Sequence, residues 1–128
     1  MMAAPLVLGN DLRTITDDVL KIVTQKDLIA IDQDPLGRQA KRIKRGARLD
    51  ILVRPLTGGR AAVCFFNRGT VLGASGKLDL KTLASDEYVA LPSKEKYSFR
   101  EVWSGESGEG SAIACKLKPD ESKVFIIE

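Results

Sequence analysis

The sequence contains no histidine, and this absence excludes more chemistry than any other feature of its composition. Histidine is the usual base that activates a serine or cysteine nucleophile, so Ser-His-Asp and Cys-His catalysis are both excluded. The commonest protein ligand for transition metals is missing as well. Carboxylates are the groups that remain for acid and base chemistry, and the chain has 17 of them.

Long apolar runs are also absent. The longest uncharged stretch, residues 1–10, is half of the ~20 residues that a membrane helix needs, so we expect no transmembrane segment and no membrane partner. The first residues carry no basic leader, which argues against a secretory signal peptide and leaves the localisation unknown. The composition, 44% hydrophobic and 29% charged, is typical of a soluble globular protein. A chain of 128 residues is too short for an eight-stranded α/β barrel of roughly 250.

The two cysteines, Cys64 and Cys115, each lie inside an apolar run, where a free thiol packs as a small hydrophobic group. We expect both to be buried and reduced. A disulfide between them stays possible if their strands are neighbours, since sequence does not set that distance. Neither cysteine has zinc-like spacing, and we expect no metal site and no cofactor.

Six positive charges lie within residues 38–48, although the net charge is only +3. Such a stripe could contact phosphates, but no aromatic side chains are interleaved for base stacking. We therefore expect a solvated edge strand, protected by its charges from pairing with other sheets, and no nucleic-acid partner. The residues are Arg38, Lys41, Arg42, Lys44, Arg45 and Arg48.

The first 37 residues predict a strand followed by two short helices. Residues 1–8 are apolar on both faces, as in a buried parallel strand, and a turn signal follows at residues 9–11. Thr16 is a suitable N-cap for a helix over 17–25, whose apolar residues recur at helical spacing. Asp27 is a suitable cap for a second short helix, which Pro35 and Gly37 bring to an end.

After Gly37 the pattern changes to short apolar runs separated by turn residues, which is typical of an antiparallel sandwich or small barrel. Residues 61–66 are apolar on both faces and predict a central strand, whereas residues 77–81 alternate and predict a strand with one wet face. The composition of residues 104–110 predicts a flexible loop. The predicted strands are 39–44, 48–54, 60–67, 76–81, 87–90, 96–103, 111–117 and 123–127.

Four phrases carry a resemblance to a known family. They are Met-Ala-Ala-Pro-Leu with Gly-Asn-Asp-Leu at residues 2–12, Ile-Asp-Gln-Asp-Pro-Leu-Gly at 31–37, Val-Arg-Pro-Leu at 53–56 and Phe-Asn-Arg-Gly at 66–69. In order and approximate spacing they resemble the C-terminal end of the melibiase-like α-galactosidases, glycoside hydrolase family 27 of clan D. In that family a (β/α)8 barrel runs into a β-sandwich, and the resemblance covers the chain from the last barrel strand onward.

The resemblance implies a mainly β fold. We expect an antiparallel β-sandwich of about eight strands, preceded by a short helical segment and an orphan strand from the end of the barrel. The corresponding divisions are a strand and turn at residues 1–12, a helical connector at 13–37 and the sandwich at 38–128. Family members have a histidine in the turn before the last strand, where this chain has Lys-Pro-Asp-Glu-Ser at 118–122.

The resemblance also implies that this chain is catalytically incomplete. Family members hydrolyse terminal α-galactosides with retention, using two aspartates at roughly 5 Å separation. By resemblance both aspartates lie on earlier barrel strands, so we expect no catalytic residue here. Asn10 and Asp11 follow the last barrel strand and are candidate substrate contacts at the barrel mouth. A turn role is the favoured interpretation for Asp11, and likewise for Asp32 and Asp34.

Two interpretations of function remain open at this point. The first is a structural module of an α-galactosidase. In it, the exposed apolar residues of 1–12 mediate self-association or dock to a barrel domain, and carbohydrate is the partner of the whole enzyme. The alternative is a non-catalytic carbohydrate-binding module, in which Trp103 stacks on a sugar ring. Tyr97, Phe99 and Trp103 more often fill the space between two sheets, so we favour a core role for them.

Overall fold

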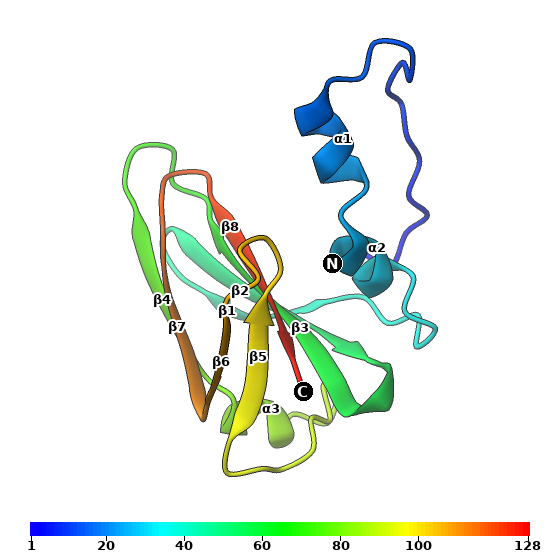
Figure 1. Cartoon of the computed structure of the whole chain (residues 1–128). Coiled ribbons are helices and arrows are strands. Elements are labelled where there is room, and N and C mark those ends of the chain that lie inside the picture. Colours follow the sequence, from blue (N-terminus) through cyan, green and yellow to red (C-terminus); the bar gives the residue numbers. More distant parts are fainter.

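The computed structural model describes residues 1–128, which form a β-sandwich with a projecting N-terminal part (Figure 1). Eight strands, three short α-helices and one 3₁₀ turn make up the chain. The elements are α1 (Asp17–Val23), α2 (Lys26–Asp32), β1 (Lys41–Arg45), β2 (Leu49–Leu56), η1 (Thr57–Gly59), β3 (Arg60–Asn67), β4 (Ala74–Asp79), α3 (Lys81–Ala84), β5 (Tyr97–Glu101), β6 (Ser107–Gly110), β7 (Ala112–Leu117) and β8 (Ser122–Ile127).

The sandwich consists of a six-stranded sheet and a two-stranded sheet, both antiparallel. The larger sheet has the order β1-β2-β3-β8-β5-β6, and the smaller one pairs β4 with β7. Only Ser111 separates β6 from β7, so the chain turns a corner there and passes from one sheet to the other. The predicted mainly β, antiparallel class is confirmed.

Most of the core lies between the two sheets. Strand β3 is central, with β2 and β8 as neighbours, and its residues 61–65 are all buried, as their apolar pattern predicts. The Phe65 ring meets the edge of Phe125 at 5.8 Å between centroids. Pro55 is tolerated in β2 because β1 pairs only with residues 50–53, so no partner strand needs its missing N–H on that side.

A second, smaller cluster covers the outer face of the six-stranded sheet. Ile31 of α2 is 4% exposed and packs with buried residues of β2, β3 and β8 and with Val102. Leu28 of the same helix packs against the edge of this cluster. Helix α2 is therefore part of the packed structure, and its apolar side chains lie on the sheet as amphipathic spacing requires.

Residues 1–24, named the arm here, are built differently. Helix α1 has no buried residue, and residues 2–14 are all exposed. Figure 1 shows the arm as an extended strand-like segment returning through α1, with the N-terminus beside α2. Thr16 caps α1 as predicted, accepting a hydrogen bond from Val19 N at 3.5 Å. The extended segment has no strand partner and is not among the eight strands, so the strand expected over residues 1–8 does not form in this chain.

Two of the secondary-structure predictions are wrong, one for a strand and one for a loop. Residues 87–90 form a turn because the Asp86 carboxylate accepts hydrogen bonds from Tyr88 N and Val89 N, and Ala90 adopts a positive φ of 49°. Such local bonds compete with strand pairing. Residues 107–110, predicted as loop, are strand β6, because Gly108 leaves room for the Phe99 ring opposite.

The remaining predictions can be placed briefly. Four of the six basic residues of the stripe lie on β1, an edge strand with exposed side chains, as expected, while Arg38 and Arg48 flank it. Cys64 is buried and Cys115 half-buried, and both thiols are free. Asp27 is not the cap of α2; Gln25 accepts from Leu28 N instead. None of the three helices is both long and apolar enough to cross a membrane.

Candidate functional site

Asn10 and Asp11, the candidate substrate contacts, lie at the exposed end of the arm. The Asp11 carboxylate accepts from Arg13 N and Arg13 Nε at 3.0 Å and from Arg13 Nη2 at 2.9 Å. These hydrogen bonds from Arg13 hold the pKa of Asp11 below its usual value. The geometry is that of an Asx turn, which is the role favoured from the sequence. A contact of Asn10 or Asp11 with substrate stays a prediction.

Asp34 joins the end of α2 to the sandwich. Its carboxylate accepts from Leu36 N at 3.0 Å, from Thr57 N at 3.0 Å and from Thr57 Oγ1 at 2.8 Å. Burial raises the pKa of Asp34, but the hydrogen bonds from Thr57 and Leu36 outweigh burial and leave the pKa lowered. These hydrogen bonds agree with the structural turn role that the sequence favours for Asp34.

Trp103 lies on the surface rather than in the core. Its residue is 48% exposed, while Tyr97 is 1% exposed and accepts a hydrogen bond from Lys94 N. The core prediction is therefore confirmed for Tyr97 and wrong for Trp103. The physical reason is the buried Glu101 carboxylate, which accepts from Trp103 N and Ser104 N and turns the chain outward immediately after β5.

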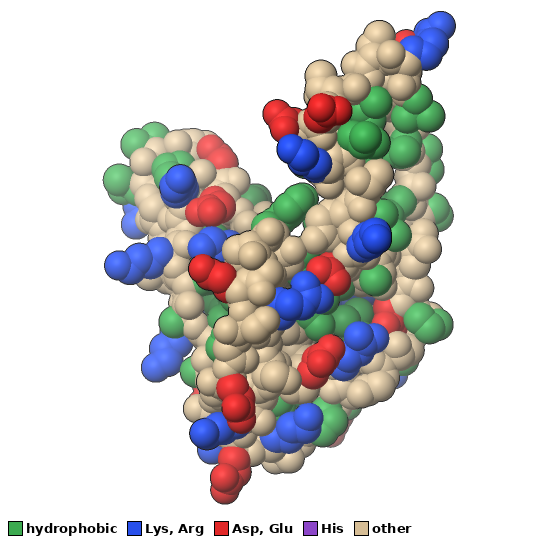
Figure 2. Space-filling model, in the orientation of Figure 1, with side chains coloured by type: hydrophobic (Ala, Val, Ile, Leu, Met, Phe, Trp, Pro, Cys, Tyr) green, Lys and Arg blue, Asp and Glu red, His purple; other side chains and the backbone are tan.

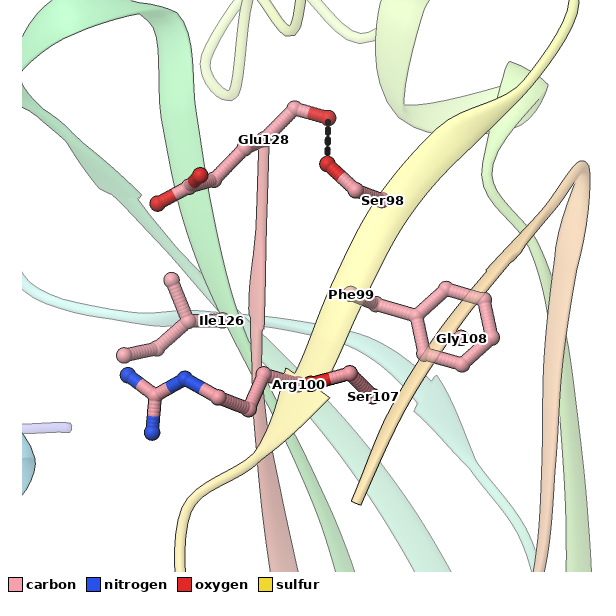
Figure 3. Close-up of a pocket in the computed structure, with 7 residues that line it drawn as sticks. All are labelled: Ser98, Phe99, Arg100, Ser107, Gly108, Ile126 and Glu128. Carbon is pink, nitrogen blue, oxygen red and sulfur yellow. Dashed lines mark hydrogen bonds between the residues drawn. The ribbon is translucent and has the colours of Figure 1, made fainter. Parts of the chain in front are cut away.

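A polar depression of about 190 Å³ lies on the outer face of β5, β6 and β8 (Figure 3). Ser98, Ser107 and Glu128 give it hydroxyl and carboxylate groups, and Ile126 gives it an apolar wall. The Arg100 guanidinium that borders it is already paired with Asp27, through contacts of 2.7 and 2.9 Å. Without a free cation, the depression offers hydroxyls and one exposed carboxylate to a ligand. Trp103 does not line it.

An apolar groove of about 520 Å³ lies between the arm and α2. Ten of its 13 lining residues are hydrophobic, and it reaches the sandwich at Val124. Figure 2 shows hydrophobic side chains gathered along the arm on this face. The arm also exposes apolar side chains fully, with Val7 at 86% and Met2 at 76%. No other part of the chain covers this groove, and exposed apolar surface of this kind is typical of an interaction site.

Three side chains that attach the arm and α2 to the sandwich were not predicted from the sequence. Arg54 donates to Met2 O at 3.2 Å and to Asp32 O at 2.9 Å. Gln25 Nε2 donates to Val102 O at 2.9 Å. Arg100 forms its two contacts with Asp27 of α2. Arg54 had a signal in the sequence, because it lies between apolar neighbours in a mostly apolar strand, where a charge needs a buried partner.

No group of three or more acidic or cysteine side chains is arranged to hold a metal ion. Burial raises the pKa of the Cys64 and Cys115 thiols to about 11, so neither is a reactive thiolate near neutral pH.

Comparison with known proteins places these surfaces in a family. Residues 46–127 match the family described as the alpha galactosidase C-terminal beta sandwich domain. The chain is 36% identical to α-galactosidase A of Cellvibrio japonicus over 120 residues, covering 88% of this chain and 28% of the relative. It is also 36% identical to chicken (Gallus gallus) α-N-acetylgalactosaminidase over 128 residues, covering 99% of this chain and 29% of the relative.

The fold comparison agrees with the sequence comparison. A candidate α-galactosidase from Bacteroides fragilis superposes with a TM-score of 0.80 at 38% identity, covering 99% of this chain and 26% of that one. The chain thus spans less than a third of the length of these relatives. The chain belongs to the family of the α-galactosidase C-terminal β-sandwich domain, which is the C-terminal part of glycoside hydrolase family 27 proteins.

Proposed function

We propose that this chain is the structural C-terminal module of an α-galactosidase-like glycoside hydrolase, and that it turns over no substrate without a catalytic barrel that it does not itself contain. One observation carries the proposal: the sandwich buries its own core, whereas the arm presents an uncovered apolar groove. The arm is then the docking element, and the barrel is the partner that covers it.

Free energy supports a partner for the arm. Met2, Leu6, Val7 and Leu8 are between 55% and 86% exposed. Burying a large apolar side chain contributes about 1.5–3 kcal/mol. Summed over these residues, the stabilisation that is forgone approaches the ~5–15 kcal/mol stability of a whole domain. A partner that buries the groove recovers it, so the arm gains its order from docking.

The carboxylates of this chain also favour a non-catalytic role. Retaining glycoside hydrolysis needs two carboxyl groups at about 5 Å, one as nucleophile and one as acid/base. Asp11 is held by Arg13, Asp27 by Arg100 and Asp34 by Thr57. Each is an acceptor of structural hydrogen bonds, and each pKa is lowered, which is the opposite of what a general acid requires.

The test is hydrolysis of a chromogenic α-galactoside by the purified chain. We expect no turnover by the chain alone. We expect turnover when it is mixed with the part of the Cellvibrio japonicus α-galactosidase A that this chain does not match, at a rate above that of this part alone. Asp11→Asn is the control, because a rate in the unmixed chain that this variant abolishes would place the active site here and overturn the proposal.

A second candidate function has one observation in its favour, the exposed ring of Trp103. A pyranose can pack its C–H face on such a ring, as in carbohydrate-binding modules. This alternative gives saturable quenching of the Trp103 fluorescence by galactosides. Because Trp103 is the single tryptophan, the signal has one source. Quenching by galactose but not by mannose would favour this function, and a flat titration with both sugars would exclude it.

A further inference from the structure

Arg54 has the largest side chain among those that are completely buried in this molecule. It is 1% exposed and lies on β2, between the buried residues Val53 and Pro55. A guanidinium in such a place is expensive, because a charge removed from water needs pairing and hydrogen bonds to compensate. Its position therefore calls for a reason other than core packing.

The hydrogen bonds of Arg54 join the start of the arm to the end of α2. Nη1 donates to the Met2 carbonyl at 3.2 Å, and Nη2 donates to the Asp32 carbonyl at 2.9 Å. Met2 begins the arm and Asp32 ends α2, so one guanidinium joins two points that are 30 residues apart in the sequence. The planar fork of arginine suits this double contact, which the point charge of lysine cannot make with the same geometry.

These contacts are poor as a source of stability for the sandwich. The nearest carboxylate oxygen, Asp32 Oδ1, lies 3.9 Å from Nη1, and Nε has no hydrogen-bond partner. A buried ion pair can often be replaced as a whole by apolar side chains at no loss of stability, so the pair is weak evidence for a stabilising role. Arg54 thus adds little to the stability of the sandwich, whereas few other hydrogen bonds hold the first residues of the arm.

The other hydrogen bonds that attach the arm and α2 to the sandwich each hold a single point. Gln25 and Asp27 hold the start of α2 through Val102 and Arg100, and Ala40 N donates to Met1 O at 2.8 Å. Among the side-chain hydrogen bonds, only those of Arg54 reach both the first residues of the arm and the end of α2. It therefore sets the spacing and the direction of the two chain segments that leave the sandwich.

We propose that Arg54 is a positioning residue that fixes the orientation of the arm and α2 on the sandwich, and that it is retained for this orientation rather than for the stability of the sheets. Removing it leaves the carbonyls of Met2 and Asp32 without a donor. Met2 is exposed and Asp32 is half-buried, so water can reach both once the segments separate. The cost falls on the placement of the arm and α2, and the core between the sheets is untouched.

The test is hydrogen exchange of the intact chain, wild type against Arg54→Met, read separately for residues 26–32 and for β3 and β8. Methionine fills a similar volume without the charge. We expect exchange in 26–32 to become at least about tenfold faster, while β3 and β8 keep their protection. Arg42→Met is the matched control, because Arg42 lies on edge strand β1 and is half exposed. It should leave residues 26–32 unchanged.

Thermal unfolding and a second variant complete the design. The Tm of the double variant Arg54→Met/Asp32→Asn, which removes both charges of the pair, should equal or exceed that of the wild type. Arg54→Lys should accelerate exchange in 26–32 as well, because one ammonium cannot bridge both carbonyls in the same geometry. A Tm of the double variant well below that of the wild type, an equal loss of protection in β3 and 26–32, or unchanged exchange in 26–32 would each overturn the proposal. No partner takes part, so these outcomes are independent of the proposed function.

Discussion

The sandwich and the arm are both rich in leucine, isoleucine and valine, but they use these residues in opposite ways. In the sandwich such side chains meet between two sheets, and Ile51, Val63 and Ile127 are completely buried. In the arm, Leu20 is 44% and Ile22 is 59% exposed, and α1 buries no residue. A seven-residue helix without packing is marginal in water. The difference teaches that the sandwich buries its apolar side chains by itself, while the arm leaves its own exposed.

Hydrogen bonds and an ion pair attach α2 and the arm to the sandwich, whereas the core of the sandwich is held by apolar packing. Arg54, Gln25 and the Asp27/Arg100 pair join α2 and the arm to the sheet, and Ile31 adds one buried apolar anchor. Directional bonds of this kind specify an orientation more than they add stability. Substitutions in one region, with stability or exchange measured in the other, therefore test the comparison.

The largest expected effect comes from the core. Phe65→Ala should lower the free energy of unfolding by about 3–5 kcal/mol, because it leaves a cavity beside Phe125 and the backbone of Gly76. Ile22→Ala in the arm should change it by less than about 0.5 kcal/mol. Urea unfolding followed by circular dichroism measures both. Equal losses in the two variants would mean that the arm belongs to the sandwich core.

A glycine comparison comes next in size. A Cβ on Gly108 would lie 2.8 Å from the Phe99 ring across the β5/β6 pair, so Gly108→Ala should cost about 1–3 kcal/mol and loosen β6. Gly9→Ala in the arm meets nothing within 4 Å and should be close to neutral. Amide chemical shifts of 97–101 and 107–110 report the first change. A neutral Gly108→Ala would show that β6 is not held by this close contact.

The Asp27/Arg100 pair should give a smaller, pH-dependent effect. Hydrogen bonding by Arg100 lowers the pKa of Asp27, so the pair stabilises the folded state above the unfolded pKa of about 4. This stability is lost as the pH falls through the folded pKa. Both side chains are about a third exposed, at 41% and 30%, so Asp27→Asn should cost under about 1 kcal/mol at pH 7.

The same variant should cost nothing at pH values below the folded pKa of Asp27, where the wild-type carboxyl is also neutral. Denaturant unfolding at pH 7 and at a series of decreasing acid pH values gives the differences. A cost that does not shrink toward acid pH would assign the effect of Asp27→Asn to packing or to α2 itself rather than to the charge.

Thiol reactivity gives the smallest and most local signal. Burial raises the pKa of both thiols to about 11, so labelling near neutral pH should be slow at each. Cys64 lies in the cluster beneath α2 and is 8% exposed, whereas Cys115 is half-buried on β7. Mass spectrometry should find Cys115 labelled first. Earlier labelling of Cys64 would mean that α2 opens from the sheet in the wild-type chain.

Most strands and both N-terminal helices could be predicted from periodicity, because alternation and helical spacing are local properties of the sequence. The strand at 87–90 and the loop at 107–110 could not. In the first, the Asp86 side chain captures backbone N–H groups. In the second, Gly108 owes its strand conformation to Phe99, which lies nine residues away. Contacts of this kind exist only once the fold has formed.

The candidate site shows the same division. The turn roles of Asp11 and Asp34 follow from local chemistry and agree with the hydrogen bonds that each makes. The exposure of Trp103 depends on the buried Glu101 carboxylate turning the chain, and the role of Arg54 depends on two carbonyls far from it in sequence. Composition can flag such charged residues in apolar strands, but it does not name their partners.

The central claim is that the arm gains its order from a catalytic barrel, and hydrogen exchange of residues 3–8 and 17–23 tests it most directly. The chain is measured alone and after addition of the part of the Cellvibrio japonicus α-galactosidase A that it does not match. The account predicts fast exchange in both segments alone and at least about tenfold slower exchange with the partner, while β3 stays unchanged. An arm already as protected as β3 in the isolated chain, or one that stays unprotected in a mixture that hydrolyses α-galactosides, would contradict it.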